Sequence, residues 1–323
     1  MPEAAACAKL NLCLAVAPPE PAANADGTPN RRAGWHRIAS WFVCIDLADR
    51  VWVERTVDAG VIEARIEFAG QPGGMPRGVV DWPAEKDLAV RALRALLDRV
   101  GSDAAERVGF RLRIEKHIPT GGGLGGGSSN AATALRLGNA LLGSPLSTHE
   151  LQAIGAKIGS DVPFFIDDVP DMRPARPALV EGFGDRIERT ASLPVLSAVL
   201  VLPPIACPTP AVYKAFDAWL GEHAAFRFRD AEARALATRS AGDAIASLNA
   251  ALFNDLAEPA MRVAPDLRAI HAACERVHRP FHVTGSGSTL FALVAPSEAE
   301  ERTRTLRAAL PSGCRVLSAR VLG

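Results

Sequence analysis

The chain has 323 residues, of which 48% are hydrophobic and 22% charged, and its 36 basic residues balance 36 acidic ones. A chain of this length and apolar content can bury a full core and form two domains of ordinary size. The mixed, balanced charge leaves no electrostatic basis for nucleic acid or an anionic membrane as the main partner. No hydrophobic run is long enough to span a bilayer.

The six cysteines show no paired short spacing and mostly lie in apolar runs, so we expect free thiols in a reducing compartment. The N-terminus superficially resembles a signal peptide, with Lys9 followed by "LNLCLAVA". That run is short, Asn11 interrupts it, and Glu3 precedes it in place of a basic cluster. The prediction is a cytoplasmic protein.

The elements of the first half follow from hydrophobic periodicity. Residues 8–16 alternate like a half-buried strand that places Lys9 and Asn11 on one face. A long loop rich in Pro, Ala and Asn follows at 17–36. Then come expected strands at about 39–47, 51–57 and 61–68, a helix at 88–100, and an alternating strand, "FRLRIEKHI".

The elements of the second half indicate an α+β protein. Ser147 and Glu150 have capping-box spacing ahead of a helix, and Pro163 prevents a helix from continuing through "GSDVPFFID". Strands are expected near 178–189 and 197–203, followed by a helix that begins at "PTP" (208–210). Long helical runs are expected between about 229 and 278. A strand, a "TGSGS" loop and another strand follow at 281–294. A helix and a last strand close the chain. Two α+β domains therefore meet near 170–180.

A glycine-rich stretch, "PTGGGLGGGSSNAA" (119–132), separates the strand "FRLRIEKHI" from an alanine-rich helix that is expected to begin near Ser128. A flexible linker is the plain alternative, but linkers rarely lie between a strand and a helix. Glycines allow backbone N–H groups to converge on an anion, and the helix N-terminus adds a positive dipole end. The stretch lacks the Lys-Ser/Thr ending of a Walker A motif and the sparse glycines of a Rossmann site. We therefore predict a phosphate-binding loop of another kind.

This glycine loop resembles the phosphate-binding motif of the GHMP kinases, the galacto-, homoserine, mevalonate and phosphomevalonate kinases. The string "GGGSSNAA" is most similar to one branch, the 4-diphosphocytidyl-2-C-methyl-D-erythritol kinases. The segments "AKLNLCL", "AGWH", "IGSDVPFF", "EGFGD", "TPAVYKAF" and "VTGSGSTLFAL" resemble other motifs of that branch, in family order from residue 8 to residue 294.

The resemblance implies a two-domain GHMP kinase fold. An N-terminal ribosomal protein S5-like domain (1–175) would bind ATP, and a C-terminal ferredoxin-like domain (176–323) would follow, with ATP and substrate in the cleft between them. It implies transfer of the ATP γ-phosphoryl group to the 2-hydroxyl of 4-diphosphocytidyl-2-C-methyl-D-erythritol, a step toward isoprenoid precursors, with Mg²⁺ as a cofactor. The partner would be this cytidyl diphosphate alone, and the protein a monomer or homodimer.

The resemblance also implies two catalytic residues, Asp161 as the base and Lys9 as its cationic partner. A lysine beside a carboxylate stabilises the ionised form, so Asp161 could accept a hydroxyl proton while Lys9 stabilises developing charge. The structural alternatives are a turn or capping Asp before Pro163 and a solvated strand lysine.

For ATP, the resemblance implies a glycine loop and the residues leading into it. Lys116 would line the adenine pocket, with a solvent-exposed strand-end lysine as the alternative. A serine hydroxyl would reach Mg²⁺, although Ser128 could instead cap the helix, and the metal ligands stay open. The implied ATP-binding residues are Lys116, Pro119, Gly121, Gly122, Gly123, Leu124, Gly125, Gly126, Gly127, Ser128 and Ser129.

For the cytidyl substrate, the resemblance implies that Trp35 stacks on the cytosine and that His36 and its neighbourhood bind the base edge. Phe183 is a second stacking platform, with core packing as its alternative, and Asn11 is a polar substrate contact. Gly285 and Gly287 would let backbone close over the diphosphate, with an ordinary turn as the alternative.

Four features depart from the family pattern. Asp87 stands where Asn is usual, which puts adenine contacts in question, and Trp35 replaces a Tyr. Ala33 replaces an Asp, and a Pro-rich extension covers about 17–32. Three other functions remain open: a GHMP kinase for another alcohol, a non-catalytic nucleotide-binding regulator that would lack the base or the cation, and a related decarboxylase.

Overall fold

The computed structural model describes residues 2–69, 78–80, 82–101, 108–239 and 245–323, and it confirms the α+β class. Two compact units share the chain. Met1–Lys9, Cys44–Thr120 and Gly125–Arg176 form the first, and Leu10–Val43, Gly121–Leu124 and Pro177–Gly323 form the second. The chain passes to the second unit after Arg176, but two earlier segments also belong to that unit. The predicted domains at 1–175 and 176–323 remain a proposal.

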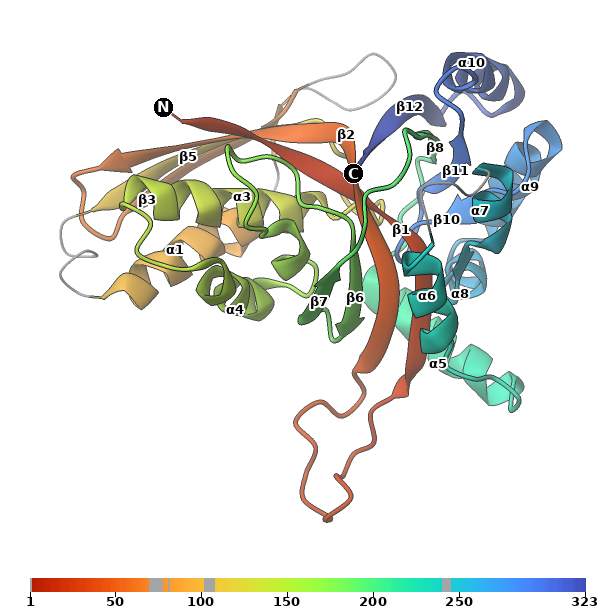
Figure 1. Ribbon diagram of the computed structural model, residues 1–323, viewed down its shortest axis with the longest axis horizontal. Helices are drawn as coiled ribbons and strands as arrows, with labels where there is room; N and C mark the ends of the chain where they lie inside the picture. Colours follow the sequence, from red (N-terminus) through yellow and green to blue (C-terminus); the bar gives the residue numbers. More distant parts are fainter. Residues whose placement is uncertain (1, 70–77, 81, 102–107, 240–244) are drawn as a thin grey trace. The chain divides into compact units, whose positions relative to one another are not determined.

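The first unit is a sheet with helices packed on it (Figure 1). The later part of β2 (His36–Thr56) runs antiparallel to β5 (Gly109–Lys116), which is parallel to β3 (Ile62–Phe68), and β3 also pairs with β4 (Gly78–Val79). Helices α1 (Leu88–Val100), α3 (Gly126–Leu141) and α4 (Thr148–Ile158) pack on one another. Short 3₁₀ turns are η1 (Ala84–Lys86) and η2 (Pro163–Phe165).

The second unit contains an antiparallel sheet of ferredoxin-like order. Its strands are β8 (Ser197–Leu202), β10 (His282–Val283), β11 (Leu290–Val294) and β12 (Arg315–Leu322). They lie in the order β10-β11-β8-β12. β8, the first of the four in the chain, therefore lies between β11 and β12, the third and the fourth. Helices follow the first and third of these strands, as in a β-α-β-β-α-β unit.

The helices of this unit cover the sheet with a shared apolar core. Between β8 and β10 the chain forms α5 (Thr209–Glu222), α6 (Asp230–Ala237), α7 (Ile245–Ala251), α8 (Ala257–Val263) and α9 (Pro265–Val277), and α10 (Ala299–Ala309) precedes β12. Buried side chains from the sheet meet those of α9 and α10, including Val199, Val201, Leu290, Leu267, Ile270 and Leu306.

Two of the remaining strands of this unit pair with β1 (Glu3–Pro19) and β2, the two strands that a long segment joins. β1 pairs in parallel with β9 (Phe253–Asn254). The first part of β2 pairs with β6 (Ala178–Gly182), which forms a hairpin with β7 (Arg186–Arg189). The segment that joins β1 to β2 extends from the ends of these two strands (Figure 1).

Several predicted elements are confirmed. The helix at 88–100 and the strand "FRLRIEKHI" correspond to α1 and β5. The capping box is present, because Ser147 accepts from the backbone of Glu150 while the Glu150 side chain accepts from Ser147 N. All six cysteines lie in the described part of the chain, and none forms a disulfide bond. Within the described part of the chain, no helix has the length and apolar character needed to cross a membrane.

Three local predictions are wrong, and one alternative for Ser128 does not hold. The strands expected at 39–47 and 51–57 are one strand, β2, because the intervening Asp49 makes buried hydrogen bonds and does not end it. Residues 8–16 are buried on both faces and not half-buried. The helical runs of 229–278 are four shorter helices interrupted by β9, and residues 240–244 lie outside the described residues. Ser128 does not cap α3, which begins at Gly126 with Gly125 as its N-cap.

Candidate active site

Lys9 and Asp161 form an ion pair in the first unit. Lys9 Nζ lies 3.5 Å from Asp161 Oδ2, and the two side chains are 4% and 27% exposed. β1 carries the lysine, and the turn between α4 and η2 carries the aspartate. The alternative of a solvated lysine does not apply, because the Lys9 side chain is buried. Asp161 does lie in a turn before Pro163, and its carboxylate faces the buried lysine. The two predicted catalytic residues are therefore together, although their roles remain predictions.

Burial controls the protonation of this lysine. Loss of solvation lowers the pKa of the Lys9 ammonium below its ordinary 10.5, and Asp161 offsets part of that shift by attraction and hydrogen bonding. Removing the carboxylate would leave the ammonium buried without this compensation. The pair is thus mutually dependent, which is the arrangement expected of a cation and a base that act on one proton transfer.

The N-terminus of α3 lies directly against this ion pair. Gly125 takes the left-handed conformation (φ 70°), and no side-chain hydrogen bond caps the helix. A Cβ on Gly125 would lie 3.0 Å from Lys9 Cγ and 3.2 Å from Phe165 Cζ. Only a glycine lets the helix start so close to the lysine. The amide groups of the first turn, with the positive end of the helix dipole, are therefore available to an anion beside Lys9.

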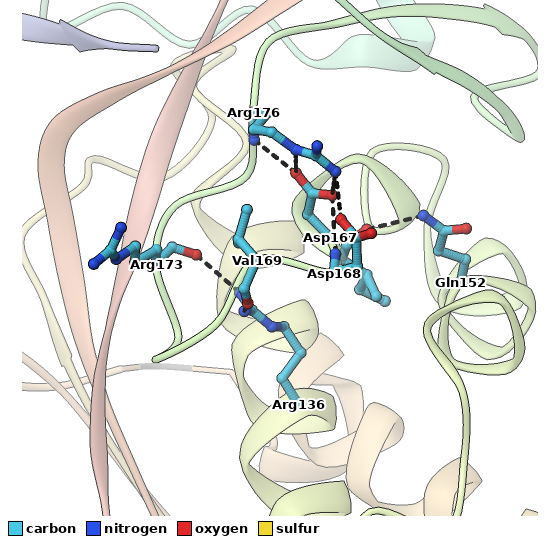
Figure 2. Close-up of polar contacts among 8 residues, drawn as sticks. Arg136, Gln152, Asp167, Asp168, Val169, Arg173 and Arg176 are labelled. Atoms are coloured by element: carbon cyan, nitrogen blue, oxygen red, sulfur yellow. Dashed lines mark hydrogen bonds and ion pairs between the residues drawn. The ribbon is translucent and has the colours of Figure 1, made fainter.

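The segment that carries Asp161 is fixed at its far end by a cluster of ion pairs (Figure 2). The Asp167 carboxylate accepts from the backbone N, Nε and Nη2 of Arg176 at 2.9, 3.0 and 2.8 Å. Gln152 of α4 donates to the carbonyl of Ile166 at 2.9 Å. Arg136 of α3 donates to the carbonyls of Val169 and Arg173. These contacts tie the chain that follows η2 to α3 and α4.

Lys116 is buried and paired, which contradicts the solvent-exposed alternative. Its Nζ lies 2.5 Å from Asp49 Oδ2, while Asp49 Oδ1 accepts from the backbone N of His117 (2.6 Å) and of Ile118 (2.7 Å). A fully buried carboxylate thus holds the turn that enters the glycine loop. The sequence does not single out Asp49, because Asp46, Arg50 and Glu54 are charged residues of the same strand. Contact between Lys116 and adenine stays a prediction.

The first half of the glycine loop packs against the "TGSGS" loop of the second unit. Asn11 N donates to Thr284 Oγ1 at 3.0 Å, and Asn11 Nδ2 donates to Ser40 Oγ at 2.9 Å. Thr289 N is 3.4 Å from the carbonyl of Gly122. Gly285 and Gly287 have φ values of 57° and 83°, so the two glycines shape this turn. Asn11 is joined to other parts of the protein; a substrate contact remains a prediction.

Replacing Gly123 should weaken ATP binding. Its φ is 75°, and a Cβ would lie 2.3 Å from the carbonyl oxygen of Thr284, a backbone atom that cannot move aside. The left-handed conformation alone costs a non-glycine residue about 1–2 kcal/mol, so we expect Gly123→Ala to lower ATP affinity about tenfold or more. Isothermal titration calorimetry measures this change.

Gly221→Ala is the matched control, because Gly221 lies within α5 and a Cβ there meets nothing within 4 Å. An unchanged dissociation constant for ATP in Gly123→Ala would show that this loop does not hold the nucleotide.

The predicted base-binding residues divide into a surface pair and a buried histidine. Trp35 is 58% exposed, and its ring centroid lies 6.1 Å from that of Phe183 at an interplanar angle of 68°. Phe183 is half-buried in the β6–β7 turn, so it is not a core residue. The structure therefore places the two predicted stacking rings side by side.

His36 points inward. Its Nδ1 lies 2.8 Å from the carbonyl of Ala17, so this nitrogen carries the hydrogen. Its Nε2 lies 3.4 Å from Asp217 Oδ1, and its ring packs on Tyr213. Binding of the cytosine edge near His36 remains a prediction.

Two departures from the family pattern have a physical description. Asp87 is the N-cap of α1: its Oδ1 accepts from Ala89 N at 2.8 Å, and its Oδ2 accepts from Trp82 Nε1 at 3.2 Å. An acid suits this position at a helix start. Ala33 is exposed, with its backbone N bonded to the carbonyl of Asn30.

Fold and site together define the class of protein, a GHMP kinase. The family model "GHMP kinases N terminal domain" matches residues 87–168, the stretch that contains the glycine loop and Asp161. Solved structures agree: a homoserine kinase from Cytophaga hutchinsonii (18% identity, TM-score 0.64, 87% of this chain and 89% of that one) has the same fold.

Sequence relatives give the branch. A 4-diphosphocytidyl-2-C-methyl-D-erythritol kinase from Caulobacter vibrioides is 37% identical over 93% of this chain and 93% of its own length. One from Xanthomonas axonopodis pv. citri is 32% identical over 95% and 86%. A crystal structure of 4-(cytidine 5'-diphospho)-2C-methyl-D-erythritol kinase matches with a TM-score of 0.68 and 29% identity over 100% of both chains. The chain belongs to the 4-diphosphocytidyl-2-C-methyl-D-erythritol kinase family.

Proposed function

We propose that this protein transfers the γ-phosphoryl group of ATP to the 2-hydroxyl of 4-diphosphocytidyl-2-C-methyl-D-erythritol. One observation carries the proposal: a buried lysine and a carboxylate lie 3.5 Å apart beside the uncapped, glycine-started N-terminus of α3. Such a site can hold a phosphate and accept a proton in the same place. The names and extent of the relatives support the choice of substrate.

In the proposed reaction, Asp161 receives the proton of the substrate hydroxyl as its oxygen attacks the γ-phosphorus. The bond from that phosphorus to the bridging oxygen of the β-phosphate breaks, and ADP leaves. A tertiary hydroxyl is a poor nucleophile, so orientation and charge must supply most of the acceleration. Lys9 holds the Asp161 carboxylate in place through their ion pair and stabilises the charge that develops on the moving phosphoryl group.

ATP would bind along the glycine loop, with its phosphates at the first turn of α3. Mg²⁺ usually keeps several waters and takes only one or two protein ligands besides phosphate oxygens. Among the described residues there is no group of three or more His, Cys, Asp or Glu side chains that could hold a metal ion. We propose that the hydroxyl of Ser128, the less buried of the two serines, would hold Mg²⁺. The metal would neutralise phosphate charge.

Product analysis tests this proposal. The protein is incubated with Mg-ATP and the cytidyl substrate, and the product is examined by ³¹P NMR and mass spectrometry. We expect a new phosphomonoester on the 2-oxygen, with the diphosphate intact. A product phosphorylated at another hydroxyl would contradict the proposed orientation of the substrate toward Asp161.

Trp35 should act on the cytidyl substrate and not on ATP. Stacking of a base on an aromatic ring contributes about 1–3 kcal/mol, so Trp35→Ala should raise KM for the cytidyl substrate about tenfold. KM for ATP should change by less than about twofold. Trp35→Tyr keeps a flat ring and should restore most of the affinity. Equal effects on both substrates would mean that Trp35 has a structural role.

Two coarser expectations complete the proposal. The lack of a disulfide bond among the six cysteines is in keeping with a reducing compartment, and we propose the cytoplasm. We propose that the protein is a monomer or a homodimer. The regulator hypothesis requires loss of the base or the cation, and both are present and paired.

A further inference from the structure

The segment that joins β1 to β2, residues 20–35, is an ordered hairpin with hydrogen bonds of its own (Figure 1). At its base, Glu20 N donates to the carbonyl of Trp35 (2.7 Å), and Gly34 N donates to the carbonyl of Glu20 (3.0 Å). Near its tip, Asp26 Oδ1 accepts from Thr28 N at 3.0 Å and from Thr28 Oγ1 at 2.6 Å. Much of the Pro-rich extension therefore has a defined structure that can position side chains.

One turn at the base of this hairpin presents two side chains to Phe183. Trp35 N donates to the carbonyl of Arg32 at 2.8 Å, and Asn30 Oδ1 accepts from Arg32 N at 2.9 Å. The guanidinium carbon of Arg32 lies 4.0 Å from the ring centroid of Phe183, and the Trp35 ring lies 6.1 Å away. Arg32 thus stacks on the same ring that Trp35 touches with an edge-on geometry.

The turn that carries Phe183 reaches back to Arg32 through a carboxylate. Asp185 Oδ1 accepts from Phe183 N at 2.9 Å, and its Oδ2 lies 3.8 Å from Arg32 Nη2. The guanidinium is therefore held by a ring face on one side and by an anion on the other. The same carboxylate fixes the backbone that carries the ring.

We propose that Arg32 is a positioning residue for the pyrimidine end of the substrate and that it acts through Phe183. This inference rests on the proposed function. A half-buried ring in a surface turn can rotate, whereas a flat cation stacked on one face restrains the plane of the ring. In this proposal the pyrimidine base would bind on the opposite face of the Phe183 ring. The hairpin thereby becomes a specificity element, and Arg32 is the residue through which it works.

A plain surface ion pair is the alternative. Arg32 and Asp185 are 50% and 41% exposed, and exposed pairs of this kind contribute little to stability. A positioning role and a plain ion pair predict different effects of Arg32→Ala. Loss of an ion pair alone would leave substrate binding untouched, whereas loss of the stacked guanidinium would loosen Phe183 and weaken pyrimidine binding.

The test compares Arg32→Ala, Arg32→Lys and the unsubstituted protein in steady-state kinetics and in calorimetric binding of cytidine diphosphate. We expect Arg32→Ala to raise KM for the cytidyl substrate and Kd for cytidine diphosphate about threefold to tenfold. We expect KM for ATP and kcat to change less than about twofold. Arg32→Lys keeps the charge without the flat stack, so it should fall between the two.

Arg50→Ala is the matched control, because Arg50 is also 51% exposed, paired with Glu3 and placed over a ring, that of Trp52. Arg50→Ala should leave KM for the cytidyl substrate and Kd for cytidine diphosphate unchanged. Unchanged values in Arg32→Ala, or equal changes for ATP and the cytidyl ligand, would overturn the inference. Failure of the proposed function would be seen separately, as absent turnover of the cytidyl substrate by the unsubstituted protein.

Discussion

Asp161→Asn is expected to lower kcat about a thousandfold while ATP binds with nearly unchanged affinity. Asparagine keeps the size and the hydrogen-bonding oxygen of the side chain but cannot accept the hydroxyl proton. General bases contribute roughly 10²–10⁴-fold to rate, and a poor nucleophile depends on the base strongly. Turnover is measured as ADP release, and ATP affinity by calorimetry.

The substitution Asp161→Asn also removes the partner of a buried ammonium, so its effect must be separated from damage to the fold. Asp171→Asn is the matched control, because Asp171 is an exposed carboxylate later on the same segment. It should retain full activity. If Asp161→Asn turned over at the rate of the unsubstituted protein, Asp161 could not be the base. A loss of ATP affinity as large as the loss of kcat would assign it to binding instead.

Lys9→Met should separate activity from stability. Removing a charge that stabilises a transition state costs about 10²–10³-fold in kcat. The free energy of unfolding at pH 7, in contrast, should not fall. Burial lowers the pKa of Lys9, so its charged form is a cost to the fold, and the Asp161 carboxylate left behind is 27% exposed and can be hydrated. Active-site groups often reduce the stability of the fold in this way.

The sign of the pH dependence follows from the lowered pKa of Lys9. Between its folded pKa and 10.5, the unfolded chain binds a proton that the folded chain has released, so stability rises with pH in this window. Relative to Lys9→Met, the unsubstituted protein should gain stability as pH approaches 10.5. Chemical denaturation across this range measures the difference. A Lys9→Met protein that is markedly less stable at pH 7 would contradict the account.

The double variant Lys9→Met/Asp161→Asn shows whether the pair acts as a unit. If Lys9 acts on the reaction only through Asp161, the double variant should lose little more activity than Asp161→Asn alone. Fully additive losses would mean that the two side chains contribute independently.

Local features of this site could be predicted from the sequence because they depend on short-range backbone chemistry. The glycine loop, the strand before it and the capping box of α4 each arise from residues near one another in the chain. The expected start of α3 near Ser128 is two residues from the observed start at Gly126, where the left-handed Gly125 takes the N-cap position that serine also favours.

Distances across the chain could not be predicted. Residues 8–16 were expected to be half-buried, and nothing in the alternation indicates that long-range packing covers both faces of β1. The bond between Asn11 and Thr284 joins residues 273 positions apart, and that between Asp49 and Lys116 joins residues 67 apart. The contact between Arg32 and Phe183 also could not be predicted, because it depends on the position of the β6–β7 turn. Side-chain partners of this kind depend on the complete fold.

The central claim is that this site phosphorylates a cytidyl alcohol, and ADP release tests it most directly. The purified protein is given Mg-ATP with the cytidyl substrate, with mevalonate, with homoserine, or with no acceptor. We expect release that depends on 4-diphosphocytidyl-2-C-methyl-D-erythritol alone and disappears in Asp161→Asn. Release with mevalonate or homoserine, or none with any acceptor from protein that still binds ATP, would contradict the claim.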